Sequence, residues 1–90
     1  MEQGGPATVL LALGAVIRVR RAELDITQGM LALPANLPRS YISELEAGKR
    51  NVALGTVVRL ADALGLDLAG LSARVGRELG RGLHPSPSPG

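Results

Sequence analysis

Residues 37–51, LPRSYISELEAGKRN, constrain the fold more strongly than any other stretch of this 90-residue chain. Pro38 has no N–H and a fixed φ, which suits the first position of a helix. Gly48 readily adopts the left-handed conformation that ends helices. Between these two signals the apolar residues recur at helical spacing. The stretch therefore predicts a short helix at residues 38–47, preceded by a turn and followed by a basic loop.

The two faces of this predicted helix differ in chemistry. Tyr41, Ile42 and Leu45 lie three and four positions apart, so they share one face, which can be buried. The opposite face carries polar side chains that have no apolar reason to be there: Arg39, Ser40, Ser43 and Glu44. A helix that buries one face and presents hydrogen-bonding groups on the other is suited to reading a groove.

Four further segments have helical spacing, and turn-forming or capping residues separate them. Thr8 and Thr27 can cap helices, and Gly65 can end one. Pro34 disfavours a helical residue before it, so a helix should end or kink there, and Asn36 tolerates the positive φ of a turn. The fold class is predicted to be all-α, a compact five-helix domain whose second and third helices form a helix-turn-helix. The predicted helices are residues 8–24, 28 to about 33, 38–47, 54–64 and 68–79.

The two ends of the chain differ in composition from its middle. Residues 1–7 are rich in Gly and Pro and predict a flexible leader. Residues 81–90 read RGLHPSPSPG, and the alternating Pro and Ser favour a disordered, solvated tail. A single domain is predicted at residues 8–80, a length with room for one modest core.

The composition argues against several kinds of site. The chain has no Cys and one His, so Cys-based zinc sites are excluded and a catalytic triad is not expected. Asp62 and Asp67 do not make an obvious acid–base pair, and no glycine-rich phosphate loop is present. We expect no enzyme activity, no metal and no cofactor. Because the net charge is only +2, local basic clusters must provide any affinity for nucleic acid.

The N-terminal part does not have the pattern of a membrane span or of a targeting segment. Residues 9–19 are apolar-rich, but Arg18, Arg20 and Arg21 interrupt the run before it reaches the length of a membrane span. In a signal peptide the positive charge precedes the apolar run, whereas here it follows. The sequence predicts a soluble, cytoplasmic protein.

Four stretches between residues 13 and 71 carry a resemblance to a known family. In chain order they read LGAVIRVRR, ITQGMLA, YISELEAGKRN and LADALGLDL, and the third is the most specific. Over this length the chain resembles the phage-repressor-like, Xre/Cro-type helix-turn-helix regulators. The resemblance implies a lambda-repressor-like domain whose third helix enters the major groove of double-stranded DNA. It also implies a transcriptional regulator that binds a specific sequence as a homodimer.

The resemblance assigns expected roles to single residues. Arg39 and Ser40 match positions that reach base edges or phosphate, and two more polar residues follow one turn later. Arg21 and Glu46 match a pair that forms a buried salt bridge between the first and third helices. The expected DNA-binding residues are Gln28, Arg39, Ser40, Ser43, Glu44, Lys49, Arg50 and Asn51, of which Gln28 and the last three match phosphate-binding positions.

Several features have alternative interpretations. The polar face of residues 38–47 could be an ordinary solvated helix face, and Arg18 and Arg20 are expected to be solvated. Gly14 weakens its helix, which predicts a close approach to another element at this position. Arg74, Arg77 and Arg81 predict a solvated face on the last helix.

The apolar face of the last helix also leaves two interpretations open. Leu71, Val75 and Leu79 either contact a second copy of the chain or close the core of the monomer. The alternative function, from a different class, is a helical protein-interaction module or an antitoxin-like partner of another protein. Loss of DNA affinity on changing Arg39, Lys49 and Arg50 would distinguish DNA binding from that alternative.

Overall fold

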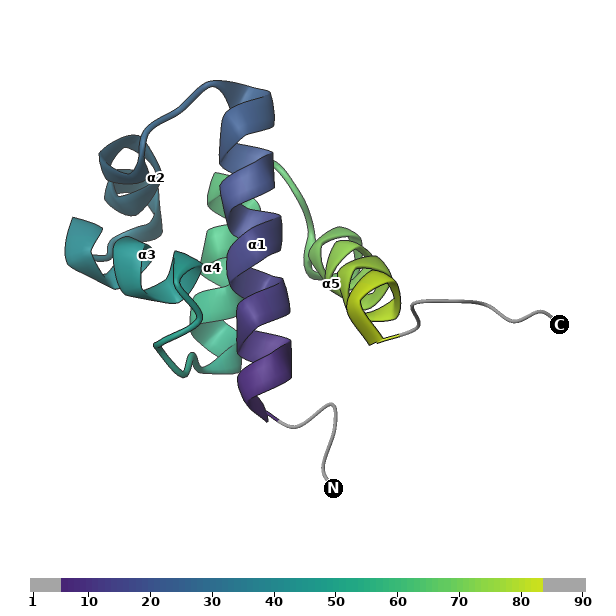
Figure 1. Ribbon diagram of the computed structural model, residues 1–90. Helices are drawn as coiled ribbons and strands as arrows, with labels where there is room; N and C mark the ends of the chain where they lie inside the picture. The colour runs from purple at the N-terminus through teal and green to yellow at the C-terminus, as the bar shows by residue number, and fades with distance from the viewer. Residues whose placement is uncertain (1–5, 84–90) are drawn as a thin grey trace, which may run out of the picture.

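The computed structural model describes residues 6–83, and all regular structure in this range is helical. α1 stands at the centre of the bundle, with α2 and α3 on one side of it and α5 on the other (Figure 1). α1 packs against α3 and α5, and α4 packs against α2 and α5. The predicted all-α fold with a helix-turn-helix at α2 and α3 is confirmed. The helices are α1 Pro6–Leu24, α2 Gln28–Ala35, α3 Arg39–Glu46, α4 Leu54–Ala63 and α5 Leu68–Leu83.

The core is aliphatic and takes residues from all five helices or from their ends. Ile42 and Leu45 of α3 are fully buried, and Tyr41 packs beside them at the edge of the core. Each such side chain stabilises the fold by about 1.5–3 kcal/mol through removal of apolar surface from water. The largest fully buried side chains are Ile17, Leu31, Ile42, Leu45, Leu60, Leu64 and Leu71.

Gly14 marks the point where α1 and α3 approach most closely. A Cβ built on Gly14 would collide with the carbonyl oxygen of Leu45 and lie 2.8 Å from that of Glu46. The predicted close approach is therefore confirmed, and only a residue without a side chain fits there. This contact fixes the end of α3 directly against the backbone of α1.

The turn between α2 and α3 depends on two local signals. Thr27 caps α2, since its side-chain oxygen accepts a hydrogen bond of 3.0 Å from the N–H of Met30. Asn36 adopts the left-handed conformation at φ 60°, as its residue type predicted. The N–H of Leu37 then donates to the carbonyl of Ala32 at 3.0 Å, which satisfies a group at the end of α2.

The sequence predicted that α2 ends or kinks at Pro34, and the helix does not end there. The helix includes Pro34 and continues through Ala35. The ring removes one helical hydrogen bond, but its side chain is exposed and the burial of Leu31, Ala32 and Ala35 holds the last turn in place. Packing of the apolar face therefore outweighs the local preference.

Three helix ends also differ from the predictions. α1 begins at Pro6, so Thr8 lies inside its first turn and does not cap it. Proline is tolerated at the first position of a helix because the first N–H groups have no helical partner. Pro38 is the residue before α3, with extended ψ of 150°, and is not its first helical residue. α5 continues to Leu83, and the 2.8 Å ion pair between Glu78 and Arg81 bridges its last turns.

These bounds shift the limits of the predicted leader and tail. Pro6 and Ala7 belong to α1, and residues 81–83 belong to α5. The rest of the predicted leader and tail lies outside the described residues. Gly48 and Gly65 both have φ of 73°, so each ends the preceding helix as predicted. Among the described residues, no helix is long and apolar enough to cross a membrane.

Candidate nucleic-acid interface

α3 presents one polar face to the outside of the bundle. Ile42 and Leu45 fix the opposite face in the core, so the helix cannot rotate without exposing both. α3 lies at the outer edge of the molecule, away from α5 (Figure 1). The structure thus brings four of the expected DNA-binding residues together on an accessible ridge, and all four are exposed: Arg39, Ser40, Ser43 and Glu44.

A nearly buried ion pair joins the end of α3 to α1. The Arg21 Nε donates to Glu46 Oε2 at 2.6 Å, and Arg21 Nη2 donates to Glu46 Oε1 at 2.9 Å. The exposed fractions of the two side chains are 18% and 6%. Arg21 Nη1 also donates to the carbonyl of Ile26 at 2.9 Å, in the link before α2. The pair that the sequence resemblance implied therefore connects α1, α3 and the entrance to α2.

The surroundings of Glu46 favour its ionised form. Burial would raise the pKa of this carboxyl, but hydrogen bonds from Arg21 and Gln28, with the positive charge of Arg21, lower the pKa below its usual range. The hydrogen bond to Glu46 raises the pKa of Arg21 in turn. Both groups are charged near neutral pH, so α3 is held by a full ion pair.

Gln28 extends this network into the first turn of α2. Its Nε2 donates to Glu46 Oε1 at 3.1 Å. An amide nitrogen carries two hydrogens, so this bond uses only one of its donors. The structure therefore places Gln28 beside the buried carboxylate, at the end of α2 where N–H groups favour an anion.

The loop after α3 carries the three remaining candidates. Lys49, Arg50 and Asn51 are all exposed. The Lys49 N–H donates to the carbonyl of Glu44 at 2.9 Å, which starts the loop close to α3. Asn51 Oδ1 accepts from the N–H of Val52 at 3.0 Å, so this side chain shapes the backbone that leads to α4.

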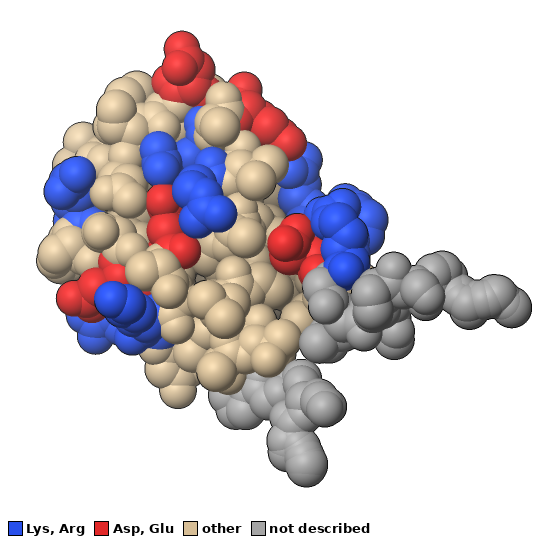
Figure 2. Space-filling view, in the orientation of Figure 1, with Lys and Arg blue, Asp and Glu red and all other residues tan. Residues whose placement is uncertain are grey.

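Charge on the visible face of the molecule is divided into small groups. Figure 2 shows several clusters of Lys and Arg with carboxylates between them, and no continuous basic surface covers the face that is drawn. This distribution agrees with the low net charge of +2. Affinity for a polyanion must therefore come from a few well-placed cations.

The structure assigns contacts to three arginines that the sequence placed on solvated faces. Arg20 Nε donates to the carbonyl of Leu64 at 3.0 Å, at the end of α4, and Arg20 Nη1 donates to Glu23 at 3.0 Å. Arg74 of α5 reaches the same Glu23 carboxylate at 3.0 Å. Arg18 Nη1 lies 3.4 Å from the carbonyl oxygen of Glu46. These residues join helices far apart in sequence, and periodicity alone carries no signal for such pairs.

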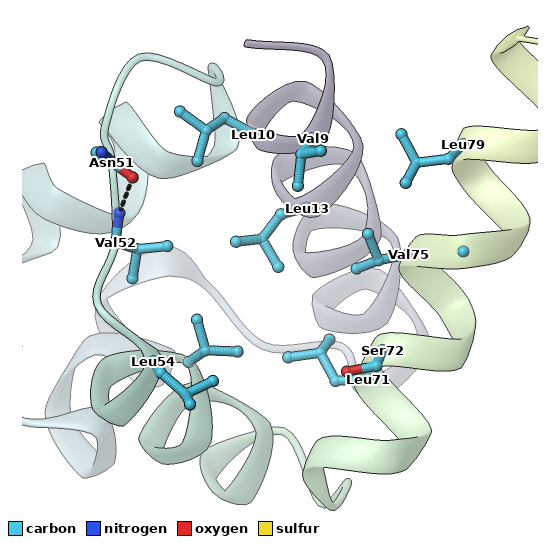
Figure 3. A pocket seen from close by; sticks show the side chains of 12 residues that line it. Val9, Leu10, Leu13, Asn51, Val52, Leu54, Leu71, Ser72, Val75 and Leu79 are labelled. Carbon is cyan, nitrogen blue, oxygen red and sulfur yellow. Dashed lines mark hydrogen bonds between the residues drawn. The ribbon is translucent and has the colours of Figure 1, made fainter. Parts of the chain in front are cut away.

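An apolar groove of about 710 Å³ lies between α1, the start of α4 and α5. In Figure 3 the side chains of Leu10, Leu13, Val52 and Val75 point toward this space. Leu71 lies at its floor and is only 1% exposed. The sequence left open whether three residues of the last helix contact a second copy of the chain or close the core. Leu71 closes the core and is too buried to be a surface contact. Val75 and Leu79 are partly exposed and line the groove.

The described residues contain no group of three or more His, Asp or Glu side chains placed to hold a metal ion.

The fold and the exposed ridge of α3 define a helix-turn-helix protein. The helix-turn-helix family model matches residues 17–71, more than half of the chain, and the chain belongs to this family. It is 40% identical over 68 residues to the immunity repressor protein of Bacillus phage phi105. The match covers 76% of this chain and 45% of the repressor, so the chain spans less than half of that relative's length.

Solved structures share the arrangement of helices. The clp gene regulator ClgR from Corynebacterium glutamicum matches with a TM-score of 0.79 and 28% identity, over 83% of this chain and 80% of ClgR. The restriction-modification controller protein C.Esp1396I, solved as a tetramer in complex with its natural 35-base-pair operator, matches with a TM-score of 0.74 and 28% identity. That match covers 79% of this chain and 93% of the controller. The family predicted from the sequence, the helix-turn-helix proteins of the phage-repressor type, is confirmed.

Proposed function

We propose that this chain binds a specific sequence of double-stranded DNA, with α3 in the major groove, and regulates transcription as a homodimer. The observation that carries the proposal is the exposed polar face of α3, fixed by a buried apolar face and by the ion pair between Arg21 and Glu46. An α-helix fits the major groove, where each base pair presents a distinct pattern of donors and acceptors. A rigidly held helix can convert that pattern into specificity.

The recognition residues have complementary chemistry. Arg39 at the start of α3 is long enough to donate two hydrogen bonds to a guanine edge, the commonest specific contact in the major groove. Ser40 and Ser43 can donate to bases or to phosphate. Their positions at the N-terminal end and along the exposed side of α3 match the part of a recognition helix that contacts bases.

Phosphate contacts flank the recognition helix. Lys49 and Arg50 provide cations, and Asn51 shapes the loop that carries them. Gln28 can keep its bond to Glu46 and give its second amide hydrogen to a phosphate at the start of α2. Each cationic contact displaces about one counterion from DNA, so binding should weaken steeply with salt.

The homodimer is proposed to form through α5 and the apolar groove beside it, with α5 lying across α1 from α3. Val75 and Leu79 line the apolar groove, and Leu54 at its rim is 67% exposed. α5 packs on α1 and α4 and leaves α2 and α3 uncovered, so a second copy on this side would keep both recognition helices accessible. Two-fold symmetric dimers of this class read half-sites about one helical turn apart.

The proposed organisation is one DNA-binding domain, as predicted for residues 8–80, with its first and last helices extending to residues 6 and 83. We place its action in the cytoplasm. The sign of regulation is proposed to be repression, in keeping with the phage immunity repressor that the chain resembles.

Selection of bound sequences from a random DNA pool tests the proposal. We expect a dyad-symmetric consensus for the wild-type chain, and loss of most affinity when Arg39, Lys49 and Arg50 are all changed to Ala. Arg77→Ala, compared with each single Ala variant, controls for the loss of one positive charge, because Arg77 is an exposed arginine on α5. Absence of enrichment at low salt, or an unchanged affinity of the triple variant, would refute DNA binding through α3.

The dimer has a separate test. Val75→Asp places a charge in the groove and should shift the chain toward monomer in analytical ultracentrifugation. Its affinity for the full consensus should fall toward its affinity for an isolated half-site. Leu33→Asp is the control, since Leu33 is 83% exposed on α2, outside the groove. Equal self-association of both variants and wild type would refute this interface.

A second candidate function is a helical protein-interaction module. The exposed apolar side chains of Met30 and Leu33 on α2 favour it, because apolar groups at a surface often mark protein contacts. Absence of any enriched DNA sequence at low salt would support this candidate.

A further inference from the structure

Glu44 and Arg50 are joined in the middle of the proposed DNA-binding surface. Arg50 Nε lies 3.1 Å from Glu44 Oε1, and the two side chains are 45% and 51% exposed respectively. The guanidinium carbon of Arg50 also lies 4.5 Å from the centroid of the Tyr41 ring. A carboxylate and an aromatic face therefore hold the same cation.

Tyr41 and Glu44, the two groups that hold Arg50, are on α3, whereas Arg50 is in the loop after it. Tyr41 packs against the hydrophobic core, and Glu44 projects from the outer face of α3. Arg50 is in the loop that Lys49 ties back to the Glu44 carbonyl at 2.9 Å. The side chain of Arg50 is thus folded back along α3 by groups whose positions the helix fixes.

This arrangement makes the carboxylate a competitor of DNA. A phosphate that approaches Arg50 must share its guanidinium with Glu44 or replace Glu44. If Glu44 is replaced, its negative charge is left facing the phosphate backbone, which is unfavourable. Where a cytosine lies under α3, its amino group can donate to the released carboxylate. The penalty then falls on sequences that offer no such donor.

We propose that Glu44 is a positioning residue that holds Arg50 against Tyr41 and limits the binding of the Arg50 guanidinium to phosphates of non-specific DNA. Glu44 lowers affinity for random sequence and so raises the ratio of specific to non-specific binding. This inference rests on the proposed function, because it concerns the same face of α3. It changes the role expected for Glu44 from that of a simple base reader to that of a group that controls a neighbouring cation.

A double-mutant cycle on DNA binding tests the proposal. Wild type, Glu44→Gln, Arg50→Ala and the double variant are titrated with random-sequence duplex and with the selected consensus over a series of salt concentrations. Glu44→Gln should bind random sequence several-fold more tightly, and the slope of log affinity against log salt should steepen by about 0.9, the value for one added phosphate contact. The steepening of the salt slope should disappear when Arg50 is Ala, because no guanidinium is then released to a phosphate.

Glu78→Gln controls for the loss of one negative charge, because Glu78 is paired with Arg81 on α5, away from α3. It should leave the salt slope unchanged. If Glu44→Gln leaves the salt slope unchanged, or steepens it equally with and without Arg50, or if Glu78→Gln has the same effect, the inference is overturned while DNA binding stands. If wild type binds neither duplex at low salt, the proposed function fails and the inference fails with it.

Discussion

Removal of the Glu46 carboxylate should destabilise the fold more than any change on the surface of α3. In Glu46→Ala the guanidinium of Arg21 loses bonds of 2.6 and 2.9 Å, and Gln28 loses one of 3.1 Å. Breaking a buried ion pair costs about 3–5 kcal/mol, since the remaining charge is left without its partner. Arg21 is still 18% exposed and keeps its bond to the Ile26 carbonyl, so we expect the lower end, about 3 kcal/mol.

Chemical unfolding followed by far-ultraviolet circular dichroism measures this loss. All variants are compared at one protein concentration, because self-association adds to apparent stability. For a domain of this size about 3 kcal/mol corresponds to a fall in Tm of roughly 12–24 °C. Glu78→Ala is the control, and its change should stay within about 0.5 kcal/mol because its ion pair with Arg81 is on the surface.

A double variant separates the interaction energy of the ion pair from the effects of the two single substitutions. Replacing both Arg21 and Glu46 with Leu removes both charges together, so it should cost less than the sum of Arg21→Leu and Glu46→Leu. If Glu46→Ala were as stable as Glu78→Ala, or if the two Leu changes were strictly additive, the ion pair would not hold α3 as we infer.

The charge of Glu46, the close contact at Gly14 and the turn at Asn36 each give a further prediction for the stability of the fold. Because the folded-state pKa of Glu46 is below its unfolded value, the stability it contributes is complete above about pH 4.3 and is lost as the pH falls through the folded-state pKa; acid titration of Glu46→Gln should show a shallower loss, and equal slopes would contradict this. Gly14→Ala should cost about 1–3 kcal/mol through collision with the backbone of α3, whereas Gly80→Ala, with nothing within 4 Å of its Cβ, should gain up to about 1 kcal/mol. Asn36→Ala should lose about 1–2 kcal/mol because of its positive φ, and Asn36→Gly should be better tolerated in the same unfolding assay; equal stability of the two would contradict the turn argument.

The sequence by itself determined the helices and the residues on each face of α3. Helical spacing of Tyr41, Ile42 and Leu45 is a local signal, because side chains three and four apart must share a side. The turn at Asn36 and the ends at Gly48 and Gly65 were also local, since few residue types adopt positive φ at low cost.

Tertiary structure decided the features in which distant residues meet. Packing of α2 carried the helix past Pro34, against the local preference for an ending. Arg20 donates a hydrogen bond to the carbonyl of Leu64, and Arg74 forms an ion pair with Glu23. These sequence separations are too long for helical periodicity to predict. Leu71 lies in the core and Val75 and Leu79 line a groove, because their burial depends on how α5 packs against α1 and α4.

The same distinction holds for the candidate site. The sequence placed Arg39, Ser40, Ser43 and Glu44 on one face from spacing alone. Only the structure brought Arg50 back onto Glu44 and Tyr41, and Gln28 onto Glu46. Those contacts depend on how a loop and two helix ends fold together in space. The residues that share a helix face can therefore be predicted from the sequence, whereas the side chains that contact them depend on the tertiary structure.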